Sequence, residues 1–179
     1  MKVVFIIAPE GFKDEELLVP LEILKKEKIE IDIASTIQGE CTGSNGAIVE
    51  SNKTLGEINV MDYDGIIFVG GPGTILIRKE AFSLSIAREA NEQKKVLGAI
   101  CWASTILAKS HTMKGRKATV WKGMDHEYGR STEQVLEMFG VTFVDEDVVI
   151  DYNIITANGS QSAEKFGKGL VKLLKEFST

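Results

Sequence analysis

Histidine, cysteine and tryptophan each occur only twice in these 179 residues, and proline occurs three times. Long apolar runs are also missing: those at 3–8 and 65–71 are far shorter than the ~18 residues that a membrane-spanning helix needs. No run of basic residues offsets the formal net charge of -5, which argues against a nucleic-acid or anionic-membrane partner. The content of 44% hydrophobic and 26% charged residues is instead typical of a globular protein.

The first residues do not read as a secretory signal, because no small-residue cleavage site follows the short apolar run after Lys2. We therefore expect a cytoplasmic protein. In a reducing compartment cysteines stay as free thiols, so Cys41 and Cys101 are expected not to form a disulfide. Cys41 lies in a polar, glycine-rich stretch and is expected to be an ordinary spectator thiol.

Apolar runs typical of strands alternate with amphipathic stretches typical of helices. The strand-like runs span 3–8, 29–35, 65–70, 96–100, 117–121, 148–150 and 153–157. The early runs are apolar at both odd and even positions, as expected for strands covered by helices on both faces. Repeated strand–helix units predict a parallel sheet with right-handed crossovers. The predicted fold class is therefore α/β, a single domain over 1–179 with a doubly wound, mostly parallel sheet sandwiched by helices.

Two stretches break this alternation. Residues 41–60 are expected to form a small hairpin or excursion from the main sheet. Residues 144–157 are expected to form an antiparallel pair that turns at 151–153.

Unusual residues follow the first, third and fourth strand-like runs. Pro9 to Gly11 and then three acids at 14–16 follow the first run, the sequence GGPGT (70–74) follows the third, and Cys101 follows the fourth. In an open parallel sheet, ligands bind beyond the carboxyl ends of the strands. We therefore expect these three features to converge on one site.

Cys101 stands at a tight turn from a strand into a predicted helix. The free amides and the dipole of a helix N-terminus stabilise a thiolate, so this position predicts an acidified, reactive cysteine. The small residues Ala99 and Ala103 let the turn pack closely, as in the nucleophile elbow of serine hydrolases. A buried structural cysteine is the alternative interpretation.

The glycine-rich stretch at 70–74 lacks the lysine of a phosphate-binding P-loop and does not fit the dinucleotide fingerprint. We expect no nucleotide, no other cofactor and no metal. A turn with positive φ is one explanation for the glycines. The functional alternative is an oxyanion hole beside the sulfur, formed by the backbone amides of Gly71 and Trp102.

Asp14, Glu15 and Glu16 open the first predicted helix, and Pro20 follows four residues after Glu16. Because proline has no N–H, the backbone carbonyl of Glu16 loses its helical partner, and the helix is expected to kink there. Acids stabilise a helix N-terminus, which accounts for two of the three. The alternative for the third is to point inward at the strand ends, and spacing alone does not identify which acid does so.

Several stretches together resemble the ThiJ/PfpI superfamily, which includes the parkinsonism-associated protein deglycase and the PfpI-type intracellular proteases. They are EELLVPLEIL (15–24), DYDGIIFVGG (62–71), AIC (99–101), MKGRKATVW (113–121) and GVTFVDEDVVIDYNIITA (140–157), so the resemblance extends over almost the whole chain. It implies a flavodoxin-like (class I glutamine amidotransferase-like) fold and a homodimer or a higher homo-oligomer. It also implies a nucleophilic Cys101 hydrogen-bonded to the glutamate four residues ahead of the helix proline, which is Glu16. A carboxyl and a thiol in contact share one proton, and we expect that proton on Glu16.

Histidines found near the cysteine in these relatives are replaced here. Trp102 directly follows the cysteine, where the protease branch has a histidine, and Trp121 stands near the position of a histidine in the deglycase branch. Both tryptophans are expected to be aromatic walls of the pocket, with ordinary packing as the alternative. His126 is a candidate base that folds back over the pocket, alone or across a dimer contact. Asp125 and Glu127 beside it are expected to be solvated loop charges.

The preferred functional interpretation is a cofactor-independent cysteine enzyme that acts on reactive carbonyls or their adducts in stress protection, as the glyoxalase and deglycase relatives suggest. Cys101 attacks the carbonyl carbon, the amides of Gly71 and Trp102 hold the oxyanion, and Glu16 moves the proton. A peptidase or amidase is the first alternative, disfavoured because expelling an amine needs a proton donor. The second alternative is a non-catalytic redox-sensing or chaperone-like protein in which Cys101 is oxidised to a sulfinate.

Overall fold

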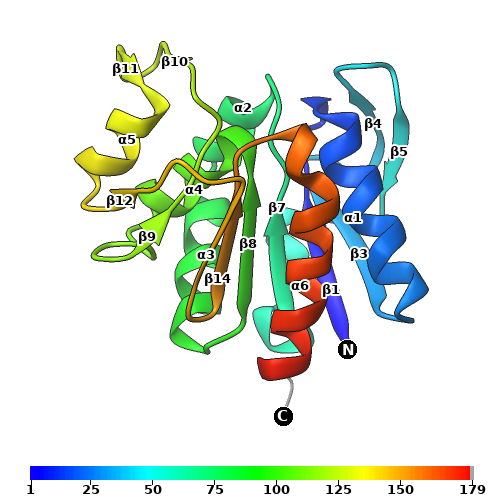
Figure 1. Ribbon diagram of the computed structural model, residues 1–179. Coiled ribbons are helices and arrows are strands. Elements are labelled where there is room, and N and C mark those ends of the chain that lie inside the picture. The colour runs from blue at the N-terminus through cyan, green and yellow to red at the C-terminus, as the bar shows by residue number, and fades with distance from the viewer. Residues whose placement is uncertain (178–179) are drawn as a thin grey trace.

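Seven strands form the main sheet of the computed structural model, which describes residues 1–177 (Figure 1). In spatial order the strands are β13 (Val148–Asp151), β14 (Ile154–Ala157), β8 (Val96–Ile100), β7 (Gly65–Phe68), β1 (Lys2–Ile6), β3 (Glu30–Ser35) and β6 (Lys53–Thr54). All neighbours in this sheet are parallel except β13 and β14, which form an antiparallel pair. The predicted mostly parallel sheet and the antiparallel pair near its end are both confirmed.

Helices cover both faces of the sheet. The helices α1 (Asp14–Lys26) and α6 (Ala163–Phe177) lie side by side on the near face in Figure 1. The other face is covered by α3 (Ala81–Glu92) and α4 (Ser104–Lys109), and α5 (Thr132–Met138) packs against α4 farther from the sheet. Between β7 and α3, the short helix α2 (Thr74–Arg78) stands at the carboxyl edge of the strands.

Every position of β1 after Lys2 is apolar, and the packing of the strand explains this pattern. Val4 and Ile6 pack into the core layer under α3 and α4, whereas Val3 and Phe5 pack into the layer under α1 and α6. All four side chains are fully buried. Each such burial contributes about 1.5–3 kcal/mol relative to exposure, so a strand with two covered faces carries no polar alternation.

Small sheets and 3-10 turns complete the chain. The antiparallel pair β4 (Gly39–Gly43) and β5 (Ile48–Ser51), joined by β2 (Glu10–Phe12), forms the predicted excursion. The predicted strand at 117–121 is reduced to β9 (Lys117–Ala118), which pairs with β12 (Thr142–Phe143) outside the main sheet, so its expected place in that sheet was wrong. The remaining elements are β10 (Met124–Asp125), β11 (Arg130–Ser131) and four 3-10 helices, η1 (Leu55–Glu57), η2 (Val60–Asp62), η3 (Cys101–Ala103) and η4 (Ser160–Ser162).

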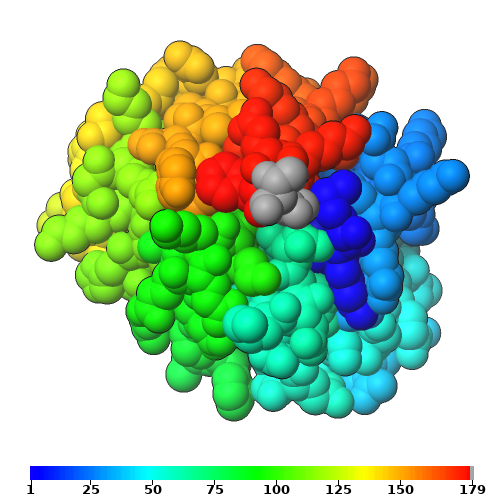
Figure 2. Space-filling model, turned by 90° about the horizontal axis from the view of Figure 1, so that it is seen from below, coloured from blue at the N-terminus to red at the C-terminus, as the bar shows by residue number. Residues whose placement is uncertain are grey.

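The amino edge of the sheet carries the chain ends. Figure 2 looks at this edge, where the first residues (blue) lie beside the last helix (red). The carboxyl ends of the strands point the opposite way, toward α2 and the β4–β5 hairpin (Figure 1). Within residues 1–177 no helix has the length and apolarity needed to cross a membrane.

Candidate active site

Cys101 lies at the abrupt end of β8. The strand stops at Ile100, and Cys101 adopts a left-handed backbone conformation with φ of 64° before the chain enters η3 and α4. A non-glycine residue in this region costs about 1–3 kcal/mol and persists only where its surroundings impose it. The turn leaves the side chain 9% exposed at the carboxyl edge of the sheet, so the predicted elbow is confirmed.

Gly70, at the end of the neighbouring strand, makes room for this turn. A Cβ atom on Gly70 would lie 2.7 Å from the Cβ of Cys101 and 2.7 Å from Oε2 of Glu16. Any side chain there would separate the thiol from the carboxyl. The glycine is therefore required for the two groups to meet.

Glu16 is the acid that points inward. Its side chain is 1% exposed, Oε1 accepts a hydrogen bond of 3.2 Å from the Ser160 hydroxyl, and the carboxyl interacts with the Cys101 thiol. Asp14 instead accepts the backbone amides of Asn45 and Ala47, which anchors the turn of the β4–β5 hairpin. Burial raises the pKa of Glu16 from 4.5 to about 7, because the charged form loses hydration.

Burial and the neighbouring Glu16 carboxyl also raise the pKa of Cys101, while the backbone amides of Trp102 and Gly71 lower it. The expectation from the sequence that the Cys101 thiol is acidified was therefore wrong. That expectation counted the amides of the turn but not the loss of water and the adjacent carboxyl. Glu16 and Cys101 titrate as one pair, and the first proton leaves the pair near pH 7.

Both predicted oxyanion-hole amides, those of Gly71 and Trp102, flank the sulfur. Gly71 has φ of 114°, and a Cβ on it would lie 2.5 Å from the Lys13 nitrogen and 2.5 Å from the Gly11 carbonyl oxygen. Only glycine lets the loop after β7 pass this close to the loop before α1. The close passage directs the Gly71 amide at Cys101.

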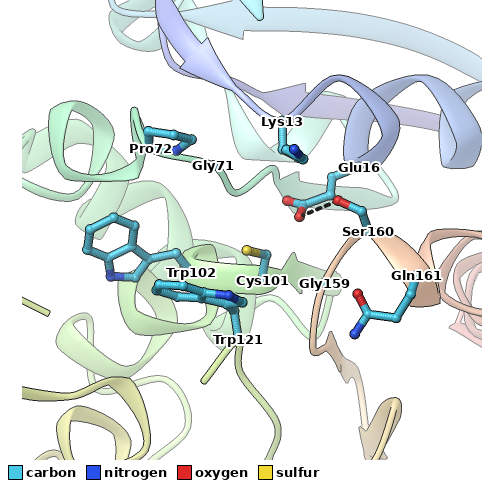
Figure 3. Close-up of a pocket in the computed structure, with 10 residues that line it drawn as sticks. All are labelled: Lys13, Glu16, Gly71, Pro72, Cys101, Trp102, Trp121, Gly159, Ser160 and Gln161. Carbon is cyan, nitrogen blue, oxygen red and sulfur yellow. Dashed lines mark hydrogen bonds between the residues drawn. The ribbon is translucent and has the colours of Figure 1, made fainter. Parts of the chain in front are cut away.

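These groups open into a cavity of about 360 Å³ (Figure 3). Its lining residues are Lys13, Glu16, Gly71, Pro72, Cys101, Trp102, Trp121, Gly159, Ser160 and Gln161. Lys13 and the segment 159–161 were missed from the sequence. The signal was available, because β14 is parallel to β8 and the residues after it must reach the same edge.

The indoles of Trp102 and Trp121 form one wall of the cavity, with ring centroids 5.8 Å apart. Trp102 is fixed from behind by a hydrogen bond of 2.8 Å from its Nε1 to Oδ2 of Asp125. The backbone amide of Trp121 donates to the carbonyl oxygen of Cys101 at 3.3 Å. The predicted place of both tryptophans as pocket walls is confirmed.

Asp125 belongs to a buried ion pair and is not a solvated loop charge. It accepts two hydrogen bonds from the Arg78 guanidinium, at 2.5 and 3.0 Å, and both side chains are fully buried. Arg78 also donates to Glu127 at 2.8 Å and to the Thr105 hydroxyl at 2.9 Å. The expectation of a solvated charge was wrong for Asp125, because it ignored the arginine in α2, 47 residues away in sequence, whereas Glu127 is exposed.

Comparison with known proteins agrees with this geometry. A family model described as DJ-1/PfpI family matches residues 1–173. The chain belongs to the DJ-1/PfpI family. It is 32% identical to a deglycase of Pyrococcus horikoshii and 31% identical to the deglycase PfpI of Pyrococcus furiosus, covering 98% of this chain and 100% of each relative. A ThiJ/PfpI domain protein from Brachyspira murdochii has the same fold, with a TM-score of 0.90 at 22% identity over 98% of this chain and 96% of that one.

Two other predictions about this DJ-1/PfpI protein need correction. His126 is exposed and is not among the residues that line the cavity of this chain, so it does not fold back over its own pocket; a role across a dimer contact stays a prediction. Cys41 is fully buried in β4, where burial raises the pKa of its thiol, so it is not an ordinary loop thiol. Both cysteines are free. Among residues 1–177 no cluster of three or more histidine, cysteine or acidic side chains is arranged to hold a metal ion.

Proposed function

We propose that this protein is a cofactor-independent cysteine enzyme that acts on small reactive carbonyl compounds or their adducts, in the manner of a glyoxalase or deglycase. The observation that carries the proposal is the contact between Glu16, whose buried carboxyl has a pKa of about 7, and the Cys101 thiol in the same cavity. A carboxyl that gains and loses a proton near neutral pH is suited to general acid–base catalysis.

The chemistry follows from these groups for a 2-oxoaldehyde such as methylglyoxal. The Glu16 carboxylate takes the proton of the Cys101 thiol as the sulfur forms a bond to the aldehyde carbon. Glu16 then gives this proton to the resulting oxyanion, which the amides of Gly71 and Trp102 stabilise. The Glu16 carboxylate then takes the hydrogen of that carbon as a proton and returns a proton to the neighbouring ketone carbon. The aldehyde carbon is oxidised and the ketone carbon reduced, which leaves a 2-hydroxy thioester. Water cleaves the thioester to the 2-hydroxy acid and regenerates the thiol.

Two observations favour this activity over proteolysis. Two relatives that are about a third identical over their whole length are named deglycases, whereas a relative from Bacillus subtilis named a putative cysteine protease is 25% identical. No histidine lines the described cavity, and expulsion of an amine from a tetrahedral intermediate needs a proton donor beside the leaving group. Trp102, which occupies the position next to the nucleophile, cannot supply that proton because its indole N–H is already donated to Asp125.

Steady-state turnover of methylglyoxal to a 2-hydroxy acid is the test. We expect turnover by the wild-type protein, loss of turnover in Cys101→Ser, and a large loss in Glu16→Gln. Cys41→Ser is the matched control, since it changes the other free cysteine, which lies away from the cavity. Stoichiometric modification of Cys101 without turnover would refute the enzyme and favour a redox-responsive protein. Cysteine-dependent cleavage of unfolded protein would favour a peptidase instead.

A further inference from the structure

The cavity is divided into an apolar and a polar side. Trp102, Trp121 and Pro72 lie on one side of the sulfur, and Lys13, Glu16, Ser160 and Gln161 lie on the other (Figure 3). A bound molecule whose carbonyl carbon is at the sulfur must place its remaining groups against one side or the other. The polar side therefore decides which substituents are accepted there.

Lys13 is the cationic residue of this lining. Its backbone amide donates to the carbonyl oxygen of Gly70 at 2.9 Å, which fixes the base of the side chain beside the glycine loop. Within the described part of the chain, its ammonium group takes part in no ion pair and no side-chain hydrogen bond. Lys13 does interact electrostatically with Glu16. Burial raises the pKa of Glu16, and the positive charge of Lys13 lowers it by a smaller amount.

Burial keeps Glu16 neutral below pH of about 7, so the Lys13 charge is not cancelled by this carboxyl there. A positive charge without a partner at the wall of a small cavity attracts an anion. Gln161 adds a polar donor on the same side, since its amide nitrogen gives one of its two N–H groups to Asn158 at 3.1 Å and keeps the other.

We propose that Lys13, assisted by the Gln161 amide, binds a carboxylate of the substrate. On this assignment, which rests on the proposed function of the cavity, the substrate class is narrowed to small reactive carbonyl compounds that also carry one carboxylate. One ammonium group balances one negative charge, whereas a phosphate dianion would leave a negative charge unbalanced beside Glu16. The apolar part of the molecule then faces the two indoles.

Alkylation of Cys101 with iodoacetate and iodoacetamide tests this assignment without any turnover. The two reagents react by the same displacement at carbon, with iodide leaving, and differ in a carboxylate against a neutral amide. The ratio of their rate constants at one pH cancels the thiolate fraction, because both reagents attack the same sulfur. Mass mapping gives the rate constant at Cys101 separately from any labelling of Cys41.

We expect the iodoacetate-to-iodoacetamide ratio to fall about tenfold in Lys13→Met, since one charge a few ångströms away in a partly exposed site is worth on the order of a tenfold change. Lys13→Arg keeps the charge and should keep most of the wild-type ratio. Lys25→Met is the matched control, because it removes an exposed lysine near the end of α1, the helix that Lys13 precedes, away from the cavity. Its ratio should equal that of the wild type.

The wild-type protein alone provides a second measurement, independent of any variant. Acetate should protect Cys101 from iodoacetamide at a concentration about tenfold lower than acetamide requires. The assignment would be overturned if acetate and acetamide protected Cys101 equally. It would also be overturned if Lys13→Met left the iodoacetate-to-iodoacetamide ratio unchanged. A preference for iodoacetate in a protein that consumes neither methylglyoxal nor a 2-oxoaldehyde with a carboxylate, such as 4,5-dioxovalerate, would refute the proposed function and leave the carboxylate site standing.

Discussion

Replacement of Glu16 by glutamine should make the stability of the protein less dependent on pH. Glu16 is 1% exposed, and its pKa is raised from 4.5 to about 7, chiefly by burial. The difference between these two pKa values corresponds to about 3 kcal/mol of folding free energy. Glutamine has the same size, keeps an oxygen that accepts from the Ser160 hydroxyl, and cannot ionise.

The direction in which the free energy of unfolding changes with pH follows from the protons that the folded and unfolded states bind. Between pH 4.5 and about 7 the folded protein holds a proton on Glu16 that the unfolded chain has already released. The stabilisation is therefore complete below pH 4.5, and the free energy of unfolding falls by about 1.4 kcal/mol per pH unit until it levels off above pH 7. Relative to Glu16→Gln, the wild-type protein should lose about 3 kcal/mol between pH 4 and pH 8.

Urea unfolding at intervals of one pH unit measures this difference, because all other groups titrate in both proteins and cancel. The comparison is best made in a Cys101→Ala background, which removes the coupled thiol and leaves a single titration. Glu22→Gln is the matched control, since it removes an exposed carboxyl from the same helix. A difference between wild type and Glu16→Gln that stays constant across this range would mean that folding does not shift the pKa of this carboxyl, and the electrostatic account of the site would fail.

Three further predictions concern other parts of the molecule. Asp125→Asn should cost about 3–5 kcal/mol of unfolding free energy, because it removes the buried partner of Arg78 and leaves only the partly exposed Glu127 as counter-ion. It should also shift the fluorescence of the two tryptophans. Glu127→Gln, at the partly exposed end of the same network, should cost less than about 1 kcal/mol, and equal costs in urea titrations would contradict this account. Iodoacetamide labelling of Cys101, followed by mass mapping, should rise through a midpoint near pH 7 while Cys41 stays unlabelled until the protein unfolds, and labelling of Cys41 in the native state would refute its burial. Light scattering should give at least the mass of a homodimer, and a monomer mass at every concentration tested would refute the expected assembly.

The strands of the main sheet were predictable because their signal is local. In β7 and β8, and in β1 after Lys2, every position is apolar, and the covered faces of a parallel sheet require that pattern. The run at 117–121 has a similar composition, yet only two of its residues pair, with β12 in a sheet of their own. Composition indicates that a segment favours extended backbone. It does not determine whether the segment can pair with a strand of the main sheet.

The convergence of Glu16, Gly71 and Cys101 was predictable for a topological reason, since each follows the carboxyl end of a parallel strand. Ser160 obeys the same rule but was missed because the direction of β14 relative to β8 was not inferred from the sequence. The burial of the charged and titratable groups was also predicted wrongly. Asp125 was expected to be solvated because its counter-ion, Arg78, comes from a helix that is distant in sequence. The pKa of Cys101 was misjudged because the loss of hydration depends on the whole surrounding fold.

The tryptophan that follows the nucleophile changes how protons can move in this site. Asp125 is the carboxylate nearest to that indole, but its oxygens are held by Arg78 and by the Trp102 N–H, and these bonds lower its pKa. A carboxylate held in this way is a poor base. Among the described residues that line the cavity, Glu16 is the one carboxyl group, so every proton transfer in the proposed reaction must pass through it or through water. The Arg78–Asp125 ion pair therefore holds the Trp102 indole in place but does not provide a second group for proton transfer. The pH dependence of turnover should follow the titration of the Glu16–Cys101 pair alone.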